Sequence, residues 1–218
     1  MNYLALGDSI SIDDYTGVVG GGAASQFARL IGAAKFLNLT RDGCTTDGVL
    51  DSLDGITIAP DVITMTAGGN DFLLAAFCGA DPNTKEGWNE LVNRPVGNLK
   101  NIVERLSEFQ CPVILNTIYD PTDGDDSVGG TLGISATYRS AYLELNNAIR
   151  ALARRPRFLL SDLHAIFAGH GIQSSETWIV GEIEPNFGGA AAIARNWFEI
   201  VSKAQLAPID ETDLGAAN

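Results

Sequence analysis

Short apolar runs alternate with helix-patterned segments along most of this chain. A run of apolar residues that ends at a turn residue is typical of a buried strand. Strands are predicted over residues 2–6, 34–40, 61–69, 111–119 and 157–162. Apolar residues three and four positions apart are typical of amphipathic helices. Helices are predicted over Gln26–Ala34, 95–109, 134–154 and 188–203.

Strands that alternate with helices indicate a parallel sheet, because the crossover between parallel neighbours is usually a helix. Strands that are apolar along their whole length are buried on both faces. We therefore predict an α/β fold, a three-layer α/β/α sandwich around a five-stranded parallel sheet. The length of 218 residues suits a single domain, expected over residues 1–207, with a C-terminal tail at 208–218.

The charge balance excludes some classes of partner. The chain has 27 acidic and 14 basic residues, which gives a formal net charge of −13. Such a chain cannot neutralise a row of phosphates, so no nucleic acid partner is expected. The apolar runs are short and interrupted, so membrane insertion is not expected either. The oligomeric state stays open.

Cysteine usage and the N-terminus add two expectations. Cys44, Cys78 and Cys111 are widely spaced and form no CxxC pair, which argues against a disulfide framework and a zinc ribbon. No metal or organic cofactor is expected. The first residues have no basic segment followed by a long apolar one, so a cytoplasmic location is expected for the sequence as it stands. A secreted location is expected if a signal peptide has been removed.

Polar residues follow the predicted strands at the points where these end. In open parallel sheets, ligands bind outside the carboxyl ends of the strands. We therefore expect the polar residues there to share a site: Asp8, Ser9, Gly43, Asn70, Asp71, Asp162, His164 and His170. A Ser at such a strand end could act as a nucleophile, and a glycine amide and an Asn side chain nearby could hold an oxyanion.

These motifs together resemble the SGNH (GDSL) hydrolases, a family of flavodoxin-like esterases and lipases. The resemblance runs through LALGDSIS, Gly43 in RDGCTTDGVL, and PDVITMTAGGNDF, and it extends to EPNFGGAAAIARNW near the C-terminus. It implies that Ser9 is the nucleophile. The Ser9 amide, the Gly43 amide and the Asn70 side chain would form the oxyanion hole. Asp8 and Asp71 would be turn residues that support the nucleophile and the oxyanion hole without contacting the substrate.

The chain departs from the family at its last motif, which reads Asp-x-x-His-Pro-Asn and supplies the general base. Aligned on Pro185 and Asn186, this chain has Gly181 in place of the Asp and Glu184 in place of the His. The usual base is therefore missing. A serine hydroxyl needs a base within hydrogen-bond reach, and a carboxylate is a weak base near neutral pH unless burial raises its pKa.

Three interpretations of this departure remain open. In the first and preferred one, His170 replaces the missing base and Glu184 or Asp162 orients it. In the second, Glu184 itself is the base in a dry pocket. In the third, the protein is a non-catalytic ligand-binding member that has lost its base. His164 directly follows a strand end and is the weaker histidine candidate. The function predicted is a serine esterase that forms an acyl-enzyme on Ser9 from a small ester, with a short acyl or acetyl group expected.

Overall fold

A parallel sheet of five strands forms the centre of the molecule. The computed structural model describes residues 1–130 and 135–206. The strands are β1 (Asn2–Gly7), β2 (Lys35–Thr40), β3 (Val62–Thr66), β4 (Val113–Asn116) and β5 (Phe158–Ser161). Their order in the sheet is β2-β1-β3-β4-β5, and every neighbouring pair is parallel. This is the flavodoxin-like order, and the predicted α/β fold is confirmed.

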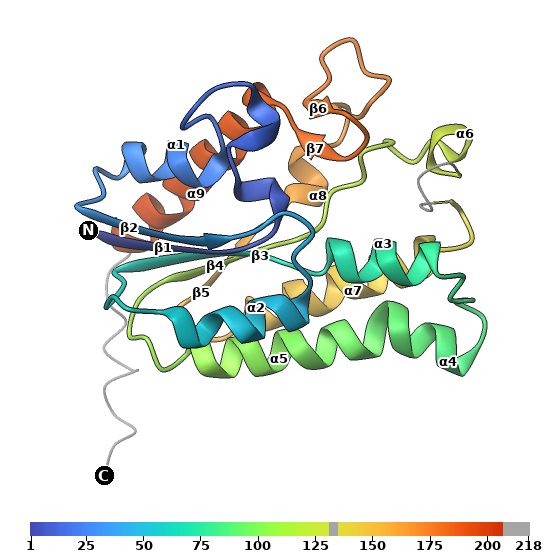
Figure 1. Cartoon of the computed structure of the whole chain (residues 1–218), viewed down its shortest axis with the longest axis horizontal. Helices are drawn as coiled ribbons and strands as arrows, with labels where there is room; N and C mark the ends of the chain where they lie inside the picture. Colours follow the sequence, from blue (N-terminus) through green and yellow to red (C-terminus); the bar gives the residue numbers. More distant parts are fainter. Residues whose placement is uncertain (131–134, 207–218) are drawn as a thin grey trace.

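Helices cover both faces of the sheet (Figure 1). One face carries α1 (Ala23–Leu30), α8 (Leu163–Ile166) and α9 (Phe187–Leu206). The other carries α2 (Thr46–Ser52), α3 (Gly69–Phe77), α5 (Arg94–Leu106) and α7 (Arg139–Leu152). Shorter elements connect them: η1 (Ser9–Ser11), η2 (Asp14–Thr16), η3 (Leu53–Gly55), α4 (Lys85–Trp88), η4 (Asn89–Asn93) and α6 (Asp126–Gly129).

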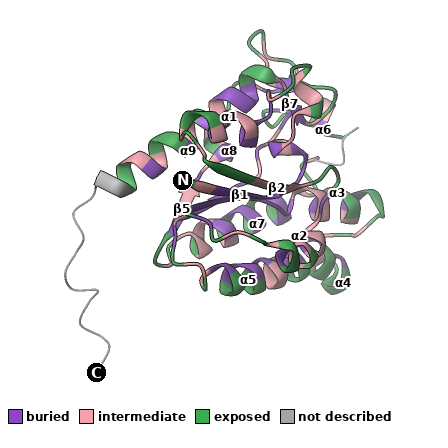
Figure 2. Cartoon of the chain, turned by 60° about the vertical axis from the view of Figure 1, so that its left-hand side comes forward, coloured by how far each residue is buried: buried purple, intermediate pink, exposed green. Residues whose placement is uncertain are grey.

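The alternating side chains of β1 supply both hydrophobic cores. Leu4 and Leu6 belong to the core under α2, α3, α5 and α7, whereas Tyr3 and Ala5 belong to the core under α1 and α9. All four are fully buried. Successive residues of a strand point to opposite faces, so an entirely apolar strand is the pattern that a sheet covered on both sides requires. Buried residues accordingly gather in the sheet and on the inner helix faces (Figure 2).

Several predicted boundaries were wrong. The fourth strand ends at Asn116 rather than residue 119, and the segment that follows leaves the sheet to wall a pocket. The predicted full burial of the second strand is wrong too, because β2 is an edge strand and Lys35 and Phe36 are exposed. The long helix predicted from residue 134 begins at Arg139. Residue 134 and the predicted tail at 208–218 lie outside the described residues.

Asn116 joins the sheet to α9 through two buried hydrogen bonds. Its Nδ2 donates to the Met65 carbonyl at 3.0 Å, and its Oδ1 accepts from Trp197 Nε1 at 2.7 Å. Both Asn116 and Trp197 are buried. A buried donor that loses its acceptor costs more than the net value of the bond that it made.

We expect Asn116→Ala to lower the free energy of unfolding by about 2–3 kcal/mol, because it leaves the Trp197 N–H without an acceptor. Urea denaturation monitored by circular dichroism measures this loss. Asn83 is exposed and bonds within its own turn, so Asn83→Ala serves as the control, with a change within about 0.5 kcal/mol. Equal effects of the two substitutions would contradict the assignment.

Candidate active site

Ser9 lies where β1 ends. Gly7 has φ +123°, and a Cβ built on it would lie 1.9 Å from the Thr66 carbonyl oxygen, so the ends of β1 and β3 approach too closely for any side chain. Asp8 then caps the turn η1, because its Oδ1 accepts from the Ile10 N–H at 3.3 Å. Ser9 opens this turn and is 5% exposed. The Gly-Asp-Ser sequence thus places a hydroxyl at the carboxyl edge of the sheet.

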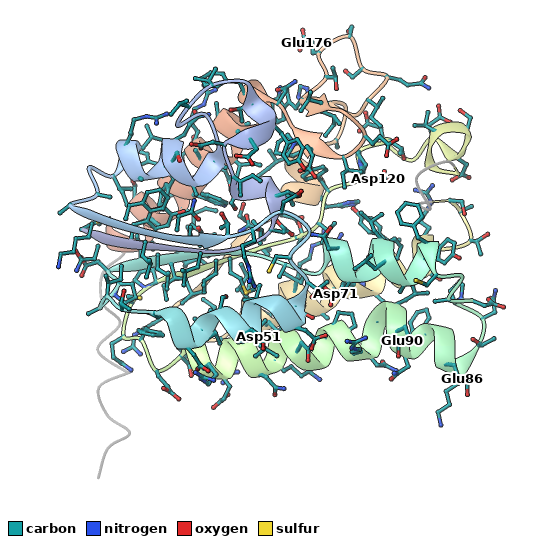
Figure 3. All side chains as sticks on the ribbon, viewed as in Figure 1. Asp51, Asp71, Glu86, Glu90, Asp120 and Glu176 are labelled. Atoms are coloured by element: carbon teal, nitrogen blue, oxygen red, sulfur yellow. The ribbon has the colours of Figure 1, made fainter. Side chains whose placement is uncertain are left out.

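Asn70 and Asp71 lie at the start of α3, directly after β3. Asn70 Nδ2 donates to the Cys44 carbonyl at 3.1 Å. The Asp71 carboxylate accepts from Thr46 N at 2.8 Å and from Thr46 Oγ1 at 2.6 Å, and Figure 3 shows it between α3 and α2. These bonds tie the turn after β2 to the start of α3. They bring the turn that contains Gly43 next to Asn70, as the sequence predicts for strand ends that share an edge.

Glu184 lies on a small hairpin outside the main sheet. The strands β6 (Ile179–Val180) and β7 (Glu184–Pro185) pair antiparallel, and Gly181 takes a left-handed conformation (φ +64°) in the turn between them. Asn186 fixes the end of this hairpin, because its N–H donates to the Trp178 carbonyl at 2.8 Å. This hairpin was not predicted, because each of its strands has only two residues and no alternation can develop over that length.

Ser9 and Glu184 face one narrow pocket of about 50 Å³. Asp8 and Asn70 also line it. The remaining walls are apolar or aromatic and come mainly from η1, α3 and the segment after β4: Ile10, Gly69, Phe72, Leu73, Ile118, Tyr119, Pro121, Tyr142 and Ile183. A few polar groups therefore line an otherwise apolar pocket, a composition typical of small-molecule sites.

Sequence reasoning missed Tyr119, Tyr142 and Ile183 as parts of this pocket. Tyr119 and Tyr142 were assigned to a strand and to the apolar face of a helix, where aromatic residues usually pack in a core. Tyr142 does lie buried on α7, and Tyr119 is buried just after the end of β4, but both also line the pocket. The signal available in the sequence was the change from the apolar run of β4 to the polar stretch at Asp120.

The pocket raises the pKa of both its carboxyl groups. Burial is the main cause for Glu184, whose pKa rises to about 7, and the charges of Asp8 and Asp42 add to it, whereas the adjacent Ser9 hydroxyl lowers it. Burial likewise raises the pKa of Asp8 to about 6, although hydrogen bonds from Thr66 and Ile10 oppose the rise. Within the described residues, Glu184 Oε2 is buried and has no hydrogen-bond partner. Near neutral pH, a carboxyl with an open acceptor thus stands beside the Ser9 hydroxyl.

The structure places the two histidines elsewhere. Among the described residues that line the pocket there is neither His164 nor His170. The His170 ring stacks on Trp178 with centroids 3.7 Å apart, and its Nδ1 lies 2.8 Å from the Glu176 carbonyl, on the protruding loop of Figure 3. The backbone of this loop is fixed by Asp123, whose carboxylate accepts from the N–H groups on either side of His170.

His164 and Asp162 take part in other contacts. His164 Nδ1 lies 2.8 Å from the Tyr142 hydroxyl, behind the pocket wall. Asp162 accepts from Arg150 Nε and Nη2 at 3.0 Å and from Thr117 Oγ1 at 2.8 Å. Partial burial raises the pKa of Asp162, but these bonds outweigh it and the pKa lies below its usual value. The structure therefore brings Ser9, Asn70, Asp8 and Glu184 together in one pocket. Asp162 is instead paired with Arg150.

Two further findings concern metals and membranes. In residues 1–130 and 135–206, no three His, Cys, Asp or Glu side chains are grouped so that they could hold a metal ion. Over the same residues, every helix is too short or too polar to span a bilayer.

Comparison with known proteins identifies relatives of this fold. The model of the GDSL-like lipase/acylhydrolase family matches residues 5–192. No curated protein sequence matches significantly. Among solved structures, the lipase Lip_vut3 from a goat rumen metagenome aligns with TM-score 0.71 and 20% identity, covering 92% of this chain and 97% of the lipase.

Two further structures align along almost their whole length. The acetyl xylan esterase AlAXEase gives TM-score 0.69 at 18% identity, with 92% of this chain and 100% of the esterase covered. An extracellular lipase from Streptomyces rimosus gives 0.67 at 18% identity, with 91% and 99% covered. At these identities the structures support the fold.

The raised pKa of Glu184 predicts a pH-dependent stability difference. The unfolded carboxyl releases its proton near pH 4.5 and the folded one near pH 7, so the wild type loses stability as pH rises through this window. Glu184→Gln does not titrate. We expect its free energy of unfolding, relative to wild type, to increase by roughly 1–3 kcal/mol between pH 4.5 and pH 8. Urea denaturation across this range measures the difference.

Asp162→Asn is the control of opposite sign. The pKa of Asp162 is lowered, so its carboxylate stabilises the fold above the unfolded pKa and this contribution is lost as pH falls. Asp162→Asn is therefore expected to be less stable than wild type at pH 8, with a gap that narrows toward pH 3. A Glu184→Gln difference that stays flat with pH would contradict the burial of a titrating carboxyl.

Proposed function

This chain belongs to the GDSL-like lipase/acylhydrolase family, and from that membership we propose that it is a serine esterase in which Glu184 is the general base. The observation that carries the proposal is the shared pocket of Ser9 and the buried Glu184 carboxyl. This was the second of the interpretations left open by the sequence. It is preferred over His170 because the His170 ring is engaged with Trp178 and the Glu176 carbonyl.

The reaction follows from these positions. Ser9 Oγ attacks the ester carbonyl carbon while its proton passes to Glu184, and a tetrahedral intermediate forms. Glu184 then gives the proton to the leaving alkoxide, and the alcohol departs from an acyl-enzyme. In the second half, water attacks the acyl carbon, Glu184 accepts its proton, and Ser9 leaves with a proton returned from Glu184.

Burial makes a carboxylate adequate for this task. A general base works best when its pKa is near the operating pH, and burial raises the pKa of Glu184 to about 7. The negative charges of Asp8 and Asp42 act in the same direction. An acidic surrounding thus increases the basicity of the group that replaces histidine.

The oxyanion is assigned to the amides of Ser9 and Gly43 and to the side chain of Asn70. Asn70 Nδ2 has two N–H groups and uses one for the Cys44 carbonyl, which leaves one for a developing negative charge. The bond to Cys44 fixes the orientation of the side chain in advance. Such preorganised donors are usually the largest contribution to acyl transfer.

The pocket favours a short acyl group. A water-sized group occupies roughly 10–15 Å³ on the scale used for cavities, so a pocket of about 50 Å³ holds only a few heavy atoms. Acetyl to butyryl esters are therefore the proposed substrates. The acetyl xylan esterase among the structural neighbours is named for an acyl group of this size.

Hydrolysis of p-nitrophenyl acetate tests the assignment of the two central residues. Ser9→Ala and Glu184→Gln are each expected to lower kcat by roughly 10²–10⁴-fold, because each removes one partner of the proton transfer. His170→Ala is the matched control, expected to stay within about threefold of wild type. If His170→Ala is as inactive as Glu184→Gln, the histidine is the base after all. Lack of turnover by the wild type on every short ester supports a binding protein instead.

The pH dependence of kcat/KM tests Glu184 separately. We expect activity to fall below about pH 7, because protonated Glu184 cannot accept the Ser9 proton. The titratable groups around Glu184 include the carboxylates of Asp8 and Asp42 and the hydroxyl of Tyr119, which stays neutral. Asp8→Asn removes one negative neighbour, so the acidic limb should move to lower pH. If the acidic limb of the profile does not move in Asp8→Asn, the group that titrates there is not Glu184.

A further inference from the structure

The hairpin that carries Glu184 is not held in place by the main sheet. Its two strands pair only with each other and are separate from the main sheet. A base must be held within a fraction of an ångström of the proton that it takes, because misplacement by about 1 Å can cost roughly 10²-fold in rate. Something outside the hairpin must therefore fix it relative to Ser9.

Tyr119 makes the contact that answers this requirement. Its hydroxyl donates to the carbonyl of Ile183, the residue directly before Glu184. Tyr119 is 5% exposed and lines the same pocket as Ser9 and Glu184. Burial raises the pKa of its hydroxyl well above the ordinary value, so the group stays a donor at any working pH.

The other end of Tyr119 is firmly anchored. The preceding residue, Ile118, is held to α7 by both of its backbone groups. Its N–H donates to Asn146 Oδ1 at 2.7 Å, and its carbonyl accepts from Tyr142 at 2.6 Å and from Asn146 Nδ2 at 2.9 Å. The Tyr119 side chain therefore links a segment that is hydrogen-bonded to α7 with the hairpin that carries Glu184.

Stacked aromatic rings brace the same hairpin from its other strand. The Tyr119 ring stacks on Phe167 with centroids 4.1 Å apart, and Phe167 meets Trp178 edge-on at 5.3 Å. Trp178 immediately precedes β6, and the His170 ring stacks on the Trp178 ring. Tyr119 thus contacts the residue before β7 directly through its hydroxyl, and it reaches the residue before β6 through Phe167.

We propose that Tyr119 is the positioning residue of the general base. Its hydroxyl holds the Ile183–Glu184 segment next to Ser9. The proposal rests on the function assigned to Glu184 above.

Tyr119→Phe tests this positioning role, because it removes the hydroxyl that bonds Ile183 and keeps the ring. We expect kcat for p-nitrophenyl acetate to fall roughly 10–100-fold, while KM stays within about twofold. Tyr3→Phe is the matched control: Tyr3 is buried, and its hydroxyl bonds Thr64 Oγ1 at 2.6 Å in the core away from the pocket. It should lose comparable stability and keep its kcat.

A readout without turnover separates this proposal from the function on which it rests. The side-chain carboxyl carbon of Glu184, assigned with Glu184→Gln, can be titrated by NMR in ¹³C-glutamate-labelled protein. In Tyr119→Phe its midpoint should move from about pH 7 toward the ordinary glutamate value, because a loosened hairpin admits water. Tyr3→Phe should leave the midpoint unchanged.

The outcomes are distinct. An inactive wild type overturns the esterase assignment, and the NMR midpoint then decides the role of Tyr119 alone. An active wild type with unchanged kcat and unchanged midpoint in Tyr119→Phe overturns the positioning role. An equal fall of kcat in Tyr3→Phe would show that any lost core bond has this effect, and would overturn it too.

Discussion

Burial of the Glu184 carboxyl beside the Ser9 hydroxyl is the constraint on which the site depends. A charged carboxylate in an apolar pocket is costly, and the protein meets this cost by raising its pKa rather than by giving it a cationic partner. An arginine in this place would satisfy the open Oε2 and remove its basicity. The unsatisfied oxygen is therefore a requirement of the proposed chemistry and not a packing fault.

The layered fold could be predicted from the sequence because strands and helices each have a characteristic pattern of apolar residues. The apolar run of β1 and the amphipathic pattern of α5 both follow from burial. The position of Ser9 and Asn70 in one pocket could be predicted for a related reason, since residues at the ends of parallel strands meet at one edge. Helices α2 and α3 were missed because they begin within the Gly-rich turns that follow strands.

The base could not be chosen from the sequence because its environment comes from segments far apart in the chain. Histidine chemistry favoured His170, and only the arrangement of Asp123, Glu176 and Trp178 explains why that ring is engaged elsewhere. Likewise, the raised pKa of Glu184 depends on walls from η1, α3 and the segment after β4. Propensity and spacing describe neighbours in sequence, whereas desolvation depends on neighbours in space.

The separation of the β6–β7 hairpin from the main sheet has a consequence for how the protein loses activity. Segments of a fold can open at a lower free energy than the whole. Among the described residues, β6 and β7 pair with no strand of the main sheet, so the hairpin can open without breaking the hydrogen bonds of that sheet. Opening of the hairpin would take Glu184 away from Ser9 while the sheet and helices stay folded, so loss of the site and global unfolding are two separate equilibria.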